Sequence, residues 1–206
     1  MTIVDIIDTI TKWADKEICS KIKLKIPPED IKESNGPGYQ HQFIKPACFP
    51  LFVPTSEKIP PSILSPTPSL CVRILKGEDD MVTNMGNIVV EFVFSTWSLG
   101  THGPDILLPQ ENHTMRQWTG KEAEAYFERN YDGWRDVWNW MDIALRAVES
   151  HLNIDGIEID RSTNVKFYQF EIEDIIPDLY PFWYAGIQFQ VKRPIVRNIV
   201  ELQDLL

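Results

Sequence analysis

Three consecutive carboxylates, Glu78, Asp79 and Asp80, form the densest group of chemically active side chains in the sequence. Carboxylates gathered at one point can bind Mg²⁺ or act as a general acid and general base. Neighbouring positions in a turn do not converge on one point without help, and no second acidic cluster stands at a motif spacing. The pattern therefore favours a solvated turn or ion-pair acceptors at a contact between subunits.

The four histidines and three cysteines do not form a catalytic pattern either. His102, Asp105 and His113 share one segment, but their spacing matches no zinc-ligand pattern and no cysteine stands near them. His151 stands at an expected helix end, where it suits the negative pole of the helix dipole. Cys71 falls within an expected strand, which favours a buried and inert thiol.

Nucleotide-binding and nucleophile motifs are not recognisable in the sequence. The segment Leu99–Gly103 has neither the glycine order of a dinucleotide loop nor the lysine of a phosphate-binding loop. Nothing in the chain supplies a nucleophile together with a base and an orienting group. The sequence predicts that the protein is not an enzyme and that it holds no cofactor and no metal.

Tryptophans are more informative than the titratable groups. Trp140 is out of phase with the apolar stripe of its expected helix, so we expect its ring on or near the exposed face. Exposed aromatic side chains are typical of interface anchors. Trp97 and Trp118 flank the segment 100–118, where they either face a partner or pin the loop. These three residues are candidate interface residues.

Composition excludes several classes of partner. The chain has 206 residues, a length that favours one domain with elaborations, and 30 acidic against 20 basic residues give a net charge of −10. Such a balance argues against nucleic acid or an anionic membrane as a tight partner. No apolar run reaches the ~20 residues of a membrane span, and the N-terminus lacks the basic start of a signal peptide. Three widely spaced cysteines fit reduced thiols in a cytoplasmic chain.

Charge and proline divide unevenly around residue 68. The segment after it carries the whole net charge of −10, and the segment before it is neutral. Ten of the 15 prolines fall between residues 27 and 68, which forbids a long helix and confines strands to sheet edges. We interpret 27–68 as a surface arm of a single domain spanning 1–206. Phe49 and Phe52 are candidates for burial against the body or against a partner.

Periodicity predicts an α+β fold, in which a single, mainly antiparallel or mixed sheet is packed by helices on one side. An N-terminal helix is expected at residues 3–18, with Thr2 and Asp5 at its start. A long amphipathic helix is expected from about Trp134 to His151, capped by Asp132.

Alternating apolar residues predict the strands of this sheet. A hairpin is expected around a turn-like segment at 77–86. Residues 100–118 look like a loop and residues 119–130 like a short helix. The expected strands are 21–26, 69–75, 87–97, 165–172 and 183–192.

Three local patterns stand in a fixed order along the chain. They are Cys71–Asp80 (CVRILKGEDD), Tyr131–Asn139 (YDGWRDVWN) and Tyr180–Gly186 (YPFWYAG). In this order they resemble the minor tail proteins of tailed phages, of the tail-terminator or tail-completion type. The resemblance covers about 69–193, whereas the arm at 27–68 and an insertion at 100–130 depart from it.

The resemblance implies a structural protein of a phage or prophage, located in the virion tail and in the host cytoplasm during assembly. It implies a ring, usually hexameric, that caps the tail tube and joins it to the head connector. DNA is expected to pass through this ring without specific binding, and neither a membrane nor a cofactor is implied.

The charge distribution suits such an assembly. A neutral, lysine-bearing first third and an acidic remainder allow unlike surfaces to meet head to tail, as a closed heterologous ring requires. Glu78, Asp79 and Asp80 are then candidate ion-pair partners between subunits. Because carboxylates repel phosphates, we expect part of the acidic surface to face the central pore.

Two other classes of function are alternatives. The same body suits another phage neck or baseplate protein, or a stand-alone interaction module, and the oligomeric state and its partner discriminate between these. A metal-dependent enzyme that uses Glu78, Asp79, His102 or His113 is the third hypothesis. Stoichiometric transition metal in the purified protein would favour it.

Overall fold

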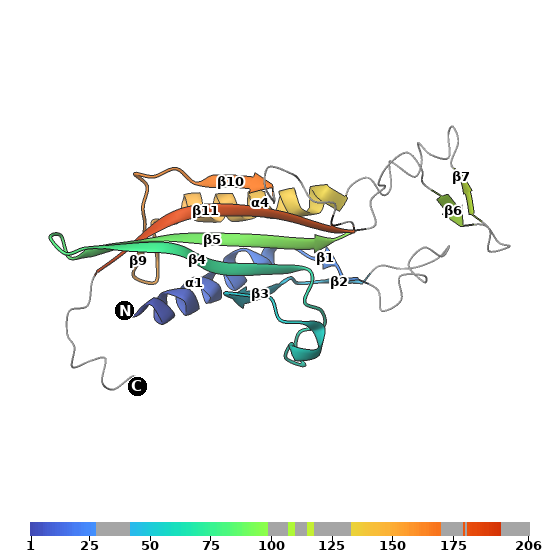
Figure 1. The fold of residues 1–206 in the computed structure, drawn as a ribbon, viewed down its shortest axis with the longest axis horizontal. Helices are drawn as coiled ribbons and strands as arrows, with labels where there is room; N and C mark the ends of the chain where they lie inside the picture. The colour runs from blue at the N-terminus through green and yellow to red at the C-terminus, as the bar shows by residue number, and fades with distance from the viewer. Residues whose placement is uncertain are drawn as a thin grey trace.

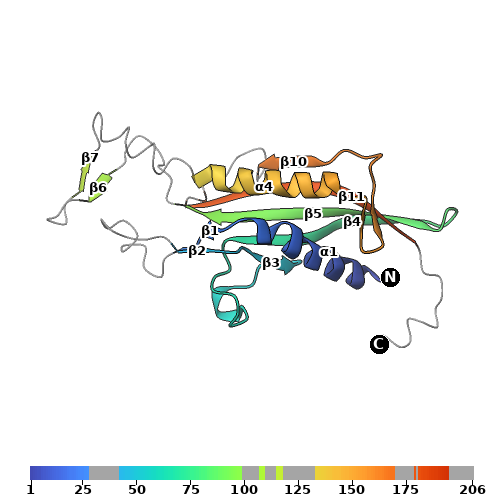
Figure 2. The ribbon, with the colours of Figure 1, turned by 180° about the vertical axis from the view of Figure 1, so that it is seen from behind.

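The computed structural model describes residues 1–27, 42–98, 107–109, 115–117, 133–169, 179 and 181–194. Within these residues the chain builds a seven-stranded mixed sheet with two helices, α1 and α4. Figure 1 views the sheet from one face, and Figure 2 shows both helices lying across the other face. The predicted α+β class, with helices on one side of the sheet, is confirmed.

The elements follow one another along the chain in the order of their labels. Short 3-10 turns at Cys19–Lys21 and Ser56–Lys58 precede β1 and β4. The helices are α1 (Ile3–Glu17) and α4 (Gly133–Ser150). The strands are β1 (Leu24–Lys25), β2 (Phe43–Ile44), β3 (Ala47–Pro50), β4 (Ser69–Asp80), β5 (Met85–Trp97), β6 (Leu107–Pro109), β7 (Met115–Gln117), β8 (Asn153–Ile154), β9 (Ile157–Ile159), β10 (Lys166–Gln169) and β11 (Phe182–Pro194).

Three long strands form the frame of the main sheet. Its strand order is β3-β4-β5-β11-β9-β8, and β10 also pairs with β11. β4 and β5 form an antiparallel hairpin, and β11 pairs with β5 from Phe182 opposite Trp97 to Pro194 opposite Met85. Only the pairing of β3 with β4 is parallel among the described strands. Two further pairs, β1 with β2 and β6 with β7, form small separate sheets.

The hydrophobic core lies between this sheet and the two helices. Alternate residues of β5 and β11 point to the helices, as the period of a strand requires. Phe94 meets Trp140 of α4 edge to face at a centroid distance of 5.1 Å, and Phe92 meets Phe189 at the same distance. The core residues of these strands are Ile88, Val90, Phe92, Phe94, Ala185, Ile187, Phe189 and Val191.

Both predicted helices are confirmed, and their ends have local causes. The Thr2 hydroxyl accepts a hydrogen bond from the Asp5 amide at 3.2 Å, and the Thr2 amide donates to the Asp5 carboxylate at 2.7 Å. This capping box satisfies two amides that the first turn leaves without helical partners. At the end of α4, His151 Nδ1 lies 2.8 Å from the Ala147 carbonyl oxygen, as its position predicts. The predicted cap Asp132 and the predicted helix at 119–130 lie outside the described residues.

One stretch of the predicted surface arm belongs to the sheet. Ala47–Pro50 forms β3, and Cys48 lies opposite Leu70 of β4. Phe49 is buried, with 6% of its surface exposed. Prolines do not prevent this pairing, because an edge strand tolerates a missing amide donor. Part of 27–68 is therefore body and not surface arm.

Several strand boundaries differ from the prediction. The segment 77–86, predicted as turn-like, is mostly strand, because β4 continues to Asp80 and β5 begins at Met85. Pairing with a long neighbour overrides the low strand propensity of its glycines and acids. Of the predicted strand at 21–26, only Leu24–Lys25 (β1) is a strand, paired with β2. The predicted loop at 100–118 contains β6 and β7, which pair antiparallel, and the hairpin of β8 and β9 was not predicted.

Candidate interaction surface

The sheet face opposite the two helices has no described helix over it (Figure 1). Side chains that alternate with the core positions point to this face, which we call the open face. On β5 they include Asn87, Val89 and Glu91, and on β11 they include Gln188 and Gln190. The same two strands, β5 and β11, therefore carry mainly polar side chains on the open face and apolar side chains on the helix-covered face.

Glu91 lies at the centre of a polar network on the open face. One carboxylate oxygen, Oε1, accepts hydrogen bonds from the Tyr168 hydroxyl and, at 3.1 Å, from the Gln188 side-chain amide. The other, Oε2, lies 3.3 Å from Arg73 Nε. The Glu91 side chain is only 8% exposed, and a buried carboxylate is tolerated where it is paired and hydrogen-bonded. The network joins β4, β5, β10 and β11 through their side chains.

Tyr168 reaches Glu91 by lying across Gly186, its direct partner on β11. A Cβ atom at Gly186 would stand 2.5 Å from the Tyr168 ring, a distance that no packed structure accommodates without movement. Burial and the hydrogen bond to Glu91 together raise the pKa of Tyr168 to about 12. The hydroxyl therefore stays protonated and acts as a donor to Glu91 throughout the neutral range.

Beside the network lies a concave region with a volume of about 450 Å³. Lys76 and Glu78 of β4, Lys166 of β10 and the amides Gln188 and Gln190 of β11 contribute to its lining. Such a set of ammonium and amide groups can bind carboxylates and main-chain peptide groups.

The loop that borders this concave region is fixed by Asp160. Its carboxylate oxygen Oδ1 lies 2.8 Å from Lys192 Nζ and accepts a hydrogen bond of 2.7 Å from the Ser162 hydroxyl. These contacts, with Lys192 the stronger, lower the pKa of Asp160 from 3.8 to about 2. The ionised carboxylate thus holds the loop after β9 against β11.

The three carboxylates at the end of β4 have separate roles within the chain. Asp79 pairs with Arg193 of β11, with oxygen to Nη2 distances of 3.0 and 3.2 Å. Asp80 accepts hydrogen bonds from the Thr83 hydroxyl and from the amides of Val82 and Thr83, and these bonds, the hydroxyl's first, lower its pKa. Glu78 lines the concave region. The three groups therefore do not converge on one point.

No described group of side chains supports the metal-dependent alternative. Within the part of the chain that the structure describes, no three His, Cys, Asp or Glu side chains are placed to hold a metal ion. His102, Asp105 and His113 lie outside these residues. Cys71 is buried, and burial raises the pKa of its thiol to about 11, as its strand position predicts.

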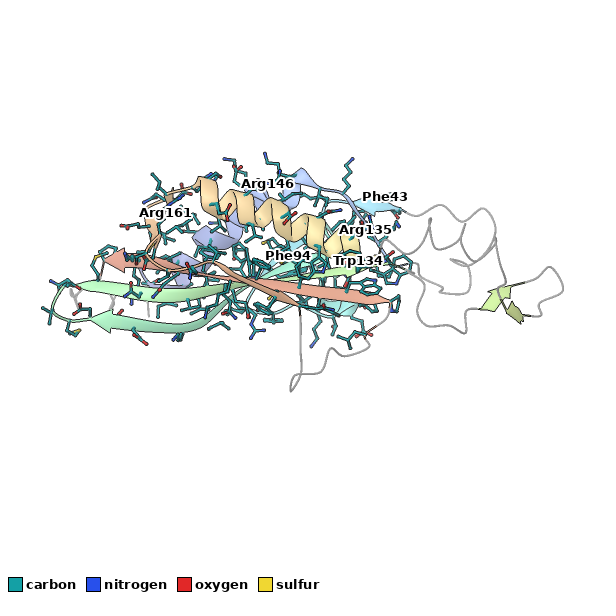
Figure 3. The ribbon with its side chains drawn as sticks, turned by 90° about the horizontal axis from the view of Figure 1, so that it is seen from above. Phe43, Phe94, Trp134, Arg135, Arg146 and Arg161 are labelled. Atoms are coloured by element: carbon teal, nitrogen blue, oxygen red, sulfur yellow. The ribbon has the colours of Figure 1, made fainter. Side chains whose placement is uncertain are left out.

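The prediction that Trp140 is exposed is wrong. Trp140 is completely buried, whereas Trp134, predicted on the apolar stripe, is 38% exposed. The buried stripe of α4 runs through Val137, Trp140 and Ala144, so it is rotated relative to the stripe deduced from the sequence. Large side chains stand on both candidate stripes, and only packing against the sheet selects one of them. Figure 3 shows Trp134 at the end of α4 remote from the β4–β5 turn.

The other aromatic candidates fall into three groups. Trp97 and Phe49 are buried in the chain, at 1% and 6% exposure, so their rings are not free to anchor a partner. Phe52 is 68% exposed and stays a candidate for partner contact. Trp118 lies outside the described residues.

The Glu91 network and the fit of Tyr168 over Gly186 were not predicted from the sequence. One signal was present: Glu91 is the single charge within the apolar run from Ile88 to Phe94. A lone charge within a buried strand indicates a partner on the same face. The identity of that partner depends on strand register, which the sequence does not show.

Comparison with protein families and with curated protein sequences finds no match to this chain. Among its described helices, none has the length and apolar character that a membrane crossing requires.

Proposed function

We propose that this protein is a tail terminator of a tailed phage or prophage. In this proposal, copies of the chain form a ring, usually hexameric, that caps the tail tube and offers its other side to the head connector. The acidic surplus of the chain lets DNA pass without being held. The protein acts through binding surfaces and not through catalysis.

The observation that carries the proposal is the placement of the three sequence patterns on one structural unit. Cys71–Asp80 is almost the whole of β4, and the described parts of the second and third patterns open α4 and β11. β4 and β11 flank β5 in the sheet, and α4 packs on these strands through Trp140 and Phe94. Patterns that are separate in the sequence thus belong to one packed body, as expected of a family signature.

Exposed apolar side chains on the arm also support an assembly role. Leu51, Phe52 and Leu64 are 54%, 68% and 65% exposed. Leu51 is nonetheless anchored, because its amide donates to the Val72 carbonyl at 2.8 Å. Apolar residues held in water on an ordered segment are typical of protein interaction sites. We assign this part of the arm to contact with the tail tube.

Electron microscopy with tail tubes tests the proposal. The tube protein of the same phage genome is polymerised in the presence and absence of the purified chain. Rings at tube ends and arrest of tube growth are the expected results. Binding along the tube wall, or no binding, would contradict the terminator function and favour another neck or baseplate role.

A pair of variants gives this experiment an internal control. Phe52→Asp should lower the occupancy of tube ends by about tenfold, because it places a charge in an apolar contact. Val4→Asp changes another exposed apolar residue, 65% exposed on α1, and should leave occupancy unchanged. Equal occupancy of tube ends for both variants would show that the arm does not contact the tube.

A further inference from the structure

We propose that copies of this chain join head to tail, the turn between β4 and β5 of one copy docking on the β1–β2 sheet of the next. The proposal rests on the ring function proposed above and names the contact that would build the ring. Two surfaces carry it, which we call the hairpin tip (Glu78 to Asn84) and the basic pair (β1 with β2).

The hairpin tip holds apolar side chains in water on an ordered turn. Val82 is 91% exposed and Met81 is 65% exposed. The Asp80 carboxylate fixes the turn, since it accepts hydrogen bonds from the Val82 amide at 2.8 Å and the Thr83 hydroxyl at 2.7 Å. Little conformational entropy remains to be lost when such a turn docks. The tip is therefore preorganised for an apolar contact.

The basic pair offers an aromatic side chain beside lysines. Phe43 of β2 is 54% exposed and lies directly opposite Lys25 of β1. Lys23, next to β1, is exposed. Neither Lys23 nor Lys25 forms an ion pair with any described residue. An apolar ring flanked by ammonium groups suits a partner that is both apolar and acidic.

The two surfaces are complementary in charge. Glu78 and Asp80 of the tip are exposed carboxylates, and Lys23 and Lys25 are their counterparts on the basic pair. Opposite charges at the rim of a contact steer association and fix its orientation. Apolar side chains at the centre of the contact, Val82 against Phe43, supply the desolvated area.

The two surfaces also lie apart along the molecule. Figures 1 and 2 show the β4–β5 turn projecting at one end of the long axis, with β1 and β2 toward the other end, and Figure 3 labels Phe43 there. One copy cannot join its own tip to its own basic pair. A contact between two different patches is heterologous, and its repetition closes into a ring when the rotation between copies permits.

A complementation experiment tests this contact. Val82→Asp damages the tip and leaves the basic pair intact, and Phe43→Asp does the reverse. For each variant alone, the dissociation constant of self-association should be at least about tenfold higher than for the wild-type protein. An equimolar mixture should form a dimer and nothing larger, because one intact tip meets one intact basic pair. Light scattering coupled to size exclusion, and sedimentation equilibrium, measure these masses.

Matched controls separate this contact from a general loss of apolar surface. Val4→Asp changes an apolar residue of α1 that is 65% exposed and outside both surfaces, and should associate like the wild type. Circular dichroism should show the same folded content for all three variants, since each position is more than half exposed. A Val4→Asp variant that loses association as Val82→Asp does would overturn the assignment to the hairpin tip.

Several results would contradict the proposal, and they differ from a failure of the terminator function. If the mixture stays monomeric at the highest soluble concentration, the tip and the basic pair do not meet. If Val82→Asp and Phe43→Asp cap tail tubes as rings like the wild type, the ring uses another contact. If the mixture forms the dimer but the wild-type protein does not bind tube ends, the contact between copies is supported and the terminator function is contradicted.

Discussion

The two faces of the main sheet stabilise their buried side chains by different interactions. The face under α1 and α4 is apolar and closed by ring contacts, such as Phe94 against Trp140. The open face buries a carboxylate, Glu91, and holds it with Arg73, Gln188 and Tyr168. Burial of apolar area is the main stabilising term in folding, whereas polar networks fix geometry at lower net gain. The closed face therefore contributes most to the stability of the fold, and the open face fixes the positions of polar side chains.

The largest expected effect comes from the closed face. Trp140→Ala should lower the free energy of unfolding by about 3 to 5 kcal/mol, because it leaves a cavity against Phe94. Urea titration followed by circular dichroism measures the change. Trp134→Ala removes a tryptophan from the same helix at a position that is 38% exposed and should cost much less. Equal losses for the two variants would contradict the helix phase described above.

A smaller effect is expected at the centre of the open face. Glu91→Ala should lower the free energy of unfolding by about 3 kcal/mol, because Gln188 and Tyr168 lose a charged acceptor. Glu78→Ala removes a carboxylate of the same face that is exposed, and should stay within about 0.5 kcal/mol of the wild type. A Glu91→Ala variant as stable as Glu78→Ala would show that the network contributes nothing to stability.

A substitution at Gly186 tests how tightly Tyr168 packs on the open face. Gly186→Ala should cost about 1 to 3 kcal/mol through overpacking, because the new Cβ would stand 2.5 Å from the Tyr168 ring. Gly77→Ala is the matched control, because its Cβ would meet its nearest neighbours at 3.5 Å. In the double variant with Tyr168→Ala the two losses should be less than additive. Full additivity would mean that the ring does not lie over Gly186.

The smallest effect is a pH dependence carried by Asp160 at the edge of the open face. Its pKa in the folded chain, about 2, lies below the usual 3.8, so folding favours the ionised form. The stabilisation is present above about pH 4 and is lost as the pH falls toward 2. Asp160→Asn should flatten the fall of unfolding free energy over this window, as urea titrations at stepped pH would show. An unchanged slope would place the acid sensitivity elsewhere.

Local signals accounted for the helices. α1 was predicted almost to its ends, because Thr2 and Asp5 form the capping box that their spacing indicates. His151 was placed correctly because the end of a helix dipole depends only on nearby residues. Such features involve residues within one turn of one another, so a sequence pattern contains all of their partners.

Contacts between distant segments were not predictable in the same way. Whether β4 ends near Leu75 or at Asp80 depends on pairing with β5, which local strand propensity does not show. The phase of α4 depends on which of two stripes meets the sheet, so Trp140 and Trp134 were assigned to the wrong sides. The neighbours of Glu91 come from three other strands, and one shift in register would replace them all.

Sequence patterns are enough to predict the α+β class, the two helices, the hairpin and the position of the prolines outside long helices. These follow from periodicity, capping and backbone restriction, each of which acts over a few residues. Three features follow from the folded structure alone: the burial of Phe49, Trp97 and Trp140, the pairing of Asp79 with Arg193, and the exposure of Val82 at the hairpin tip. Burial and ion pairing depend on which segments meet, and that is a property of the folded chain.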